Sequence, residues 1–137
     1  MIKNNKKCLM LAAGSLLAFS ANALTQDSHY LSSECDHMAR ALYQLAESKS
    51  QDACAGDVMV AASYLESASI RITKGKYKQA STSLNYGEYE LKAISMYRPY
   101  CSNFASQVKP LLAKLITIET QLDELEMSLK LNKKDEQ

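Results

Sequence analysis

The feature that most constrains this chain is a repeat of apolar side chains every three or four positions, which continues through most of the sequence after residue 28. Such spacing places the apolar side chains on one stripe of an α-helix. Glycine and proline, which interrupt helices, occur only 4 and 2 times in the chain. The pattern predicts four helices, over residues 28–48, 52 or 57–73, 76–98 and 102–131.

Four amphipathic helices joined by short loops pack best as an antiparallel bundle. We therefore expect an all-α fold, an antiparallel four-helix bundle with up-down-up-down topology. Gly75 follows the end of the second helix, where glycine is the usual residue. Pro99 ends the third helix, because the residue before a proline avoids helical geometry. Pro110 predicts either a kink in the last helix or a start of that helix near Lys109.

The last predicted helix carries the cleanest apolar seam of the chain, formed by Val108, Leu111, Leu115, Ile118, Leu122, Leu125 and Leu129. This helix is longer than its neighbours. We therefore expect Leu122, Leu125 and Leu129 to project past the end of the bundle, where an apolar seam would associate with another helix. The alternative is that residues 24–31 fold over them.

The N-terminal segment has the three parts of a secretory signal peptide in the usual order. It begins with a lysine-rich region without acidic residues, continues with an apolar stretch over residues 8–20, and ends at the small-residue motif Ala21-Asn22-Ala23. The apolar stretch is shorter than the roughly 20 residues that span a bilayer. These features predict a signal peptide that is cleaved and a mature protein that works in the periplasm or, alternatively, outside the cell. A buried N-terminal helix or an uncleaved anchor is the other interpretation.

Cleavage divides the chain into a Sec signal peptide over residues 1–23, a helical bundle domain over 24–131 and a polar C-terminal tail over 132–137. Three of the 16 basic residues leave with the signal, so 13 basic and 15 acidic residues remain. A slightly acidic domain lacks the basic footprint that nucleic acid binding requires. No later segment is apolar enough for stable membrane insertion.

Three cysteines remain after cleavage, and the predicted topology selects one pair of them. Cys54 and Cys101 fall in the two loops at the same end of the bundle. Cys35 lies 13 residues before Ser48 in the first helix, which is roughly 20 Å away along the axis and too far for a disulfide. The sequence therefore predicts a Cys54–Cys101 disulfide that staples the domain, although Cys35 takes one of the two partners if the first helix starts elsewhere.

Cys35 is then the odd thiol. It lies on the apolar stripe between Leu31 and Met38, where a free cysteine behaves as a small apolar side chain. The alternative is a reactive thiol or an intermolecular disulfide.

Motifs for catalysis or metal binding are missing from the sequence. It contains no G-x-S-x-G, no glycine-rich phosphate loop and no H-E-x-x-H, and we expect neither an enzyme nor a cofactor. His29 and His37 flank acidic residues and Cys35, but eight positions separate the two histidines. Helical metal ligands are usually three or four positions apart, so a surface histidine pair is the simpler interpretation and no metal site is predicted.

The third helix carries a second apolar stripe, which lies nearly opposite its core stripe and consists of Tyr86, Tyr89, Ala93, Met96 and Tyr100. A bundle helix needs one apolar face, and tyrosine is enriched where proteins meet. Together with Arg98, the stripe predicts a surface that binds another protein or a second copy of the chain. The alternative is that a neighbouring helix, or the segment that leads into the first helix, packs over it.

These observations favour a small exported protein that acts by protein–protein binding, such as an inhibitor or immunity protein or a secretion or assembly accessory. The alternative is a carrier of a small ligand or metal in the bundle core. Polar side chains in the core would favour a carrier, but the stripes are almost wholly apolar.

Overall fold

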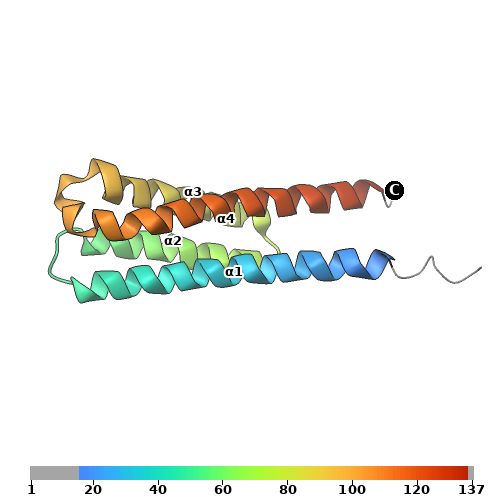
Figure 1. Cartoon of the computed structure of the whole chain (residues 1–137), viewed down its shortest axis with the longest axis horizontal. Helices are drawn as coiled ribbons and strands as arrows, with labels where there is room; N and C mark the ends of the chain where they lie inside the picture. The colour runs from blue at the N-terminus through green and yellow to red at the C-terminus, as the bar shows by residue number, and fades with distance from the viewer. Residues whose placement is uncertain (1–15, 136–137) are drawn as a thin grey trace, which may run out of the picture.

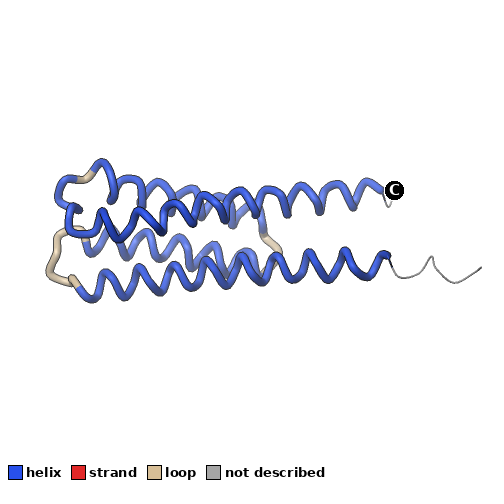
Figure 2. Tube along the Cα trace, viewed as in Figure 1, coloured by secondary structure: helices blue, strands red, loops and turns tan. Residues whose placement is uncertain are grey.

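The computed structural model describes the backbone of residues 16–135 and the side chains of residues 24–135. Within this range the chain forms four helices that run alternately in opposite directions (Figure 1), and Figure 2 shows only helices and loops. The bounds are α1 Leu16–Ser48, α2 Ala55–Thr73, α3 Tyr77–Lys92 and α4 Ser102–Asp135. Each helix packs on the next one in sequence, and α4 also packs on α1. The predicted antiparallel four-helix bundle is confirmed.

The apolar repeats of α2 and α3 face the core, as the three- and four-residue spacing predicts. Val58, Leu65 and Ile72 of α2 are buried, as are Leu84 and Leu91 of α3. Small residues let these two helices approach: Gly87 of α3 faces Leu65, and a Cβ atom at position 87 would come within 3.3 Å of the Leu65 Cδ2 atom. The close α2–α3 contact therefore depends on the missing side chain at position 87.

The turn between α2 and α3 has the geometry that its glycine predicts. Gly75 has φ +68°, a left-handed conformation that costs glycine little. The Lys76 amide donates to the carbonyl of Arg71 at 2.8 Å, and the Gly75 amide donates to that of Ile72 at 2.9 Å. This pair of hydrogen bonds is the Schellman motif, which satisfies the last carbonyls of a helix.

The third helix differs from its predicted extent, because α-helical geometry ends at Lys92. A π-helical turn, η1, follows over Ala93–Tyr97, and a 3₁₀ turn, η2, covers Pro99–Cys101. Arg98 between them has extended backbone, with φ −100° and ψ 103°. Proline at position 99 explains this conformation, since its ring disfavours helical geometry in the preceding residue.

The fourth helix begins at Ser102, as predicted, and continues through Pro110. The alternative start near Lys109 is therefore wrong. Phe104 and Val108 are buried and hold the turns before the proline on the core. The apolar seam is confirmed at five of its seven positions. Leu111 is only half-buried while its neighbour Leu112 is buried, and Leu129 is also half-buried.

Two predictions are wrong at the end of the bundle that contains the α2–α3 turn. α1 begins at Leu16 rather than near residue 28, and it continues beside α4 past the α2–α3 turn (Figure 1). Leu122 and Leu125 are consequently buried instead of projecting into solvent, which confirms the alternative that residues 24–31 cover them. Alanine and leucine favour helix, and this explains why α1 extends into the apolar N-terminal region.

The predicted signal peptide remains a prediction. Residues 1–15 lie outside the described part of the chain, and residues 16–23 form the first turns of α1. α4 extends to Asp135, so helix continues into the predicted polar tail, of which residues 136 and 137 are not described.

Candidate functional site

A disulfide closes one end of the bundle. Cys54, just before α2, and Cys101, in η2, are joined with a Cα–Cα distance of 5.1 Å, and both are fully buried. This confirms the predicted pair. Asp52 ties the same loops together, since its carboxylate accepts hydrogen bonds from the Asn103 amide at 2.8 Å and from the Cys54 backbone at 2.9 Å. These two hydrogen bonds, that of Asn103 first, lower the pKa of Asp52.

Arg98 and Tyr100 are fixed beside this disulfide by two carboxylates. The Arg98 guanidinium donates to Glu90 at 2.7 Å and lies 3.4 Å from an oxygen of Asp57. The Tyr100 hydroxyl donates to the same Asp57 oxygen at 2.8 Å. The bond to Glu90 raises the pKa of Arg98, and the bond to Asp57 raises that of Tyr100. The guanidinium charge is therefore balanced within the molecule.

The predicted stripe remains largely exposed. Tyr86, Tyr89, Met96 and Tyr100 expose 56%, 65%, 55% and 52% of their area. Ala93 is buried, because it begins η1 and packs inward. Each of these four side chains therefore stays more than half uncovered by the described part of the chain.

Tyr97 was missing from the predicted stripe, although it is 71% exposed. It follows Ala93 by four positions, so the same helical spacing could have included it. We call Tyr86, Tyr89, Met96, Tyr97 and Tyr100 the tyrosine surface. From α2, Tyr64 stacks on Tyr86 with ring centroids 5.4 Å apart, a contact that sequence spacing does not reveal.

Cys35 is buried and free. Burial, and then the charge of Glu34, raises the pKa of its thiol to about 12, so almost no reactive thiolate forms near neutral pH. The thiol packs as an apolar side chain, and the reactive alternative finds no support in this environment. His29 and His37 are both exposed, and His37 lies 3.8 Å from Glu34.

The tightest group of potential metal ligands within residues 24–135 is formed by Cys54, Cys101 and Asp57, whose ligand atoms lie within 4.8 Å of one another. Both sulfur atoms belong to the disulfide, and a metal ligand must be a thiolate. The oxidised protein therefore offers only the carboxylate of Asp57 at this point.

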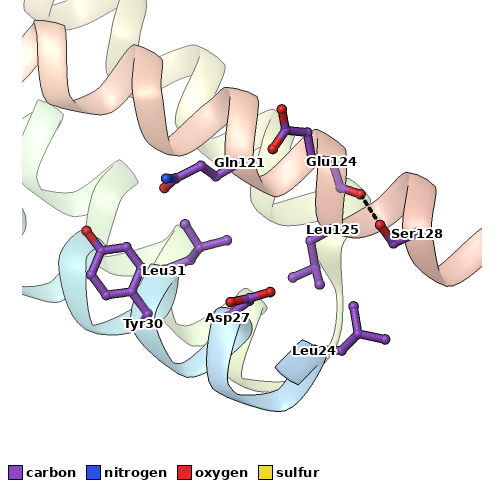
Figure 3. A pocket seen from close by; sticks show the side chains of 8 residues that line it. All are labelled: Leu24, Asp27, Tyr30, Leu31, Gln121, Glu124, Leu125 and Ser128. Atoms are coloured by element: carbon purple, nitrogen blue, oxygen red, sulfur yellow. Dashed lines mark hydrogen bonds between the residues drawn. The ribbon is translucent and has the colours of Figure 1, made fainter. Parts of the chain in front are cut away.

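A groove between α1 and α4 has a volume of about 280 Å³. Figure 3 shows Leu24, Asp27 and Leu31 of α1 opposite Glu124 and Leu125 of α4. The Ser128 hydroxyl, which also lines the groove, donates to the carbonyl of Glu124 at 2.9 Å. Leu31 and Leu125 close its floor, so the groove is a surface feature and does not lead into the bundle core.

One carboxyl group between α3 and α4 has a buried oxygen without a hydrogen bond in the described part of the chain. The Oε1 atom of Glu119 is buried and lacks a hydrogen-bond partner among the described residues. Burial, followed by the nearby charge of Glu88, raises the pKa of Glu119 to about 7, while Lys92 opposes that shift. Lys92 forms an ion pair with Glu88.

None of the described helices combines the length and hydropathy needed to cross a membrane. The disulfide is consistent with an oxidising compartment. No family model, curated protein or solved structure matches this chain.

Proposed function

We propose that this protein is exported and acts by binding another protein through the tyrosine surface. The observation that carries the proposal is the exposure of five large side chains, each by more than half, on α3 and the turns after it. Tyrosine and methionine are enriched in protein interfaces, where their burial contributes much of the binding free energy. Four of the eight tyrosines of the chain belong to this surface.

The surroundings of the tyrosine surface support binding because they hold it in place. The disulfide anchors η2, Asp57 holds the Tyr100 hydroxyl, and Tyr64 supports the Tyr86 ring. Side chains that are fixed before association lose less conformational entropy when a partner binds. Since Arg98 is already paired with Glu90, we expect aromatic burial rather than net charge to drive this interaction.

The proposed setting is the periplasm, with the extracellular space as the alternative. The N-terminal segment supports export by its lysine-rich start, its apolar stretch and its Ala21-Asn22-Ala23 motif. A protein of this kind serves as an inhibitor or immunity protein, or as a secretion or assembly accessory. A non-catalytic role agrees with the lack of catalytic motifs in the sequence.

Site-specific photo-crosslinking in intact cells tests the proposal. A benzophenone amino acid replaces Tyr89 in one variant and Tyr30 in a control variant, because Tyr30 is 53% exposed on α1 outside the tyrosine surface. We expect a discrete crosslinked product from position 89 and none of that size from position 30. The Tyr89→Ala substitution should then weaken binding to the identified partner by at least tenfold, about 1.4 kcal/mol, with the melting temperature unchanged.

Light scattering of the exported protein, with and without reductant, separates self-association from binding to a different protein. A dimer that Tyr89→Ala dissociates would identify a second copy as the partner. Equal crosslinking from positions 89 and 30, or a Tyr89→Ala variant that loses stability rather than binding, would contradict the proposal.

A further inference from the structure

The strongest unassigned feature lies at the opposite end of α3 from the tyrosine surface. A groove of about 440 Å³ runs between the α2–α3 turn and the last turns of α4. It lies where α4 continues past the α2–α3 turn, which forms a step in the bundle (Figure 1). Four lysines line it, namely Lys76, Lys78, Lys130 and Lys133, with Glu126 as the only acidic lining residue. We call this feature the lysine groove.

The charges of the lysine groove are mostly unpaired. Lys130 forms an ion pair with Glu126 at 2.8 Å. Lys76, Lys78 and Lys133 have no acidic partner in the part of the chain that the structure describes. The lining thus carries a net charge of +3, whereas residues 24–137 together contain 13 basic and 15 acidic residues.

Folding alone does not account for these lysines. Lys76 precedes the first residue of α3 and Lys78 lies in its first turn, which contains no acidic residue. A helix N-terminus carries a partial positive charge, so acidic side chains stabilise it and basic ones do not. Two lysines at this position therefore oppose the helix dipole, and an external acidic group would relieve that repulsion.

The floor and the shape of the groove favour a linear ligand over a flat membrane surface. Tyr77 and Leu129 line it and are partly buried against the core, so it offers apolar contact between the charges. Its lysines extend from both sides of a concave step rather than from a flat or convex face. A linear chain can enter such a step, whereas a flat bilayer surface does not reach its floor.

We propose that the lysine groove binds an acidic peptide segment of another protein, with carboxylates at the lysines and an apolar side chain on Tyr77 and Leu129. Charge complementarity carries this assignment. The lysine groove is separate from the tyrosine surface, so this proposal does not depend on the one above.

The probe for the test is a short fluorescein-labelled peptide of glutamates with interspersed leucines, titrated with the purified exported protein and followed by fluorescence anisotropy. The decisive variant is Lys78→Glu, because it adds an acidic side chain to the first turn of α3. The helix dipole then stabilises the fold while the groove loses charge complementarity. We expect at least a tenfold loss of affinity, with a melting temperature that is unchanged or higher.

Lys109→Glu is the matched control, since Lys109 is exposed on α4, distant in sequence from the groove, and equally unpaired among the described residues. It makes the same change in net charge and should retain most of the affinity. A peptide with serine in place of leucine should bind more weakly if the apolar floor takes part. Equal losses from Lys78→Glu and Lys109→Glu would overturn the proposal. The proposal would also be overturned if the peptide does not bind while phosphatidylglycerol vesicles bind the wild-type protein and fail to bind the Lys78→Glu variant.

Discussion

The two ends of this bundle are built in different ways. At the stapled end the α1–α2 loop and the turns after α3 are joined by the Cys54–Cys101 disulfide and by Asp52. At the open end α1 and α4 continue alone past the α2–α3 turn (Figure 1), and Leu24, Leu31 and Leu125 provide the contacts. A covalent link and hydrogen bonds to Asp52 fix the first end, whereas apolar contact between two helices holds the second.

The two ends also differ in the side chains that they expose. The stapled end presents aromatic side chains beside charges that are already paired, notably Arg98 with Glu90. The open end presents the lysine groove, whose charges are mostly unpaired. The bundle therefore has an aromatic surface with paired charges at one end and a positively charged groove at the other, and we propose that each binds a protein segment.

Removal of the disulfide should have the largest effect and should change the stapled end most. The bond joins residues 47 positions apart, and closing a loop of that length contributes about 4 kcal/mol through the entropy of the unfolded chain. We expect the Cys54→Ser, Cys101→Ser double variant to lose about that much in urea unfolding. Cys35→Ala is the control, because it removes a thiol without removing a link. A double variant that unfolds at the same urea concentration as the wild type would show that the staple contributes little.

A pair of leucine truncations compares packing in the middle of the bundle with packing at the open end. Leu84→Ala removes a fully buried side chain between helices and should cost about 3–4 kcal/mol. Leu125→Ala lies beside the α1–α4 groove, where solvent can enter the space, and should cost about 2 kcal/mol. Chemical denaturation of both variants measures the difference. A larger loss at Leu125 would reverse the order of stability assigned to the two regions.

The pH dependence of stability tests the surroundings of Glu119, which lies between α3 and α4. The folded pKa of Glu119, about 7, lies above its ordinary value of 4.5, so the folded state binds a proton that the unfolded state releases. Stability should therefore fall as pH rises from about 4.5 to about 7. Because the side chain is only partly buried, we expect a loss of about 1 kcal/mol.

Glu119→Gln keeps the shape of this side chain and removes its charge. The free energy of unfolding of the variant should not fall over that pH window. At pH 8 the variant should be more stable than the wild type. Glu88, Lys92 and Asp123 face the same group, and Asp123→Asn serves as the matched control with a smaller effect. An identical pH profile for wild type and Glu119→Gln would contradict the assigned environment.

The smallest effect is expected at the α2–α3 turn, which borders the open end. Gly75 has a positive φ of 68° and open space where a Cβ atom would lie. The cost of Gly75→Ala is therefore conformational, about 1 kcal/mol. Gly56→Ala is a useful contrast, since Gly56 lies in the first turn of α2 with similar open space and without a positive φ, and it should be neutral or slightly stabilising.

Much of this molecule was predictable from the sequence because helical spacing fixes which side chains face inward. The apolar repeats of α2 and α3 followed from spacing, the helix end at Gly75 followed from residue type, and the Cys54–Cys101 pair followed from topology. The π-helical turn did not, since nothing in the apolar spacing indicates where a helix widens. For that reason Ala93 was assigned to the exposed stripe although it is buried, and Tyr97 was omitted.

The candidate sites depended on contacts between residues distant in sequence, which the spacing does not contain. The Arg98 contacts to Glu90 and Asp57 appear only once the turns after α3 are placed. The lysine groove combines residues 76–78 with residues 130–133. In the sequence these look like two unrelated charged stretches, and only the position of the α2–α3 turn against α4 brings them together.

The most direct test of the central claim is hydroxyl-radical footprinting of Tyr89, Tyr97 and Tyr30 in intact cells and in dilute purified protein. All three rings are more than half exposed in the isolated chain, so their oxidation rates in the purified protein should be similar. In cells, a bound partner should protect Tyr89 and Tyr97 severalfold relative to Tyr30. Equal oxidation of all three in cells would show that nothing covers the tyrosine surface, and would contradict its proposed role as the binding site.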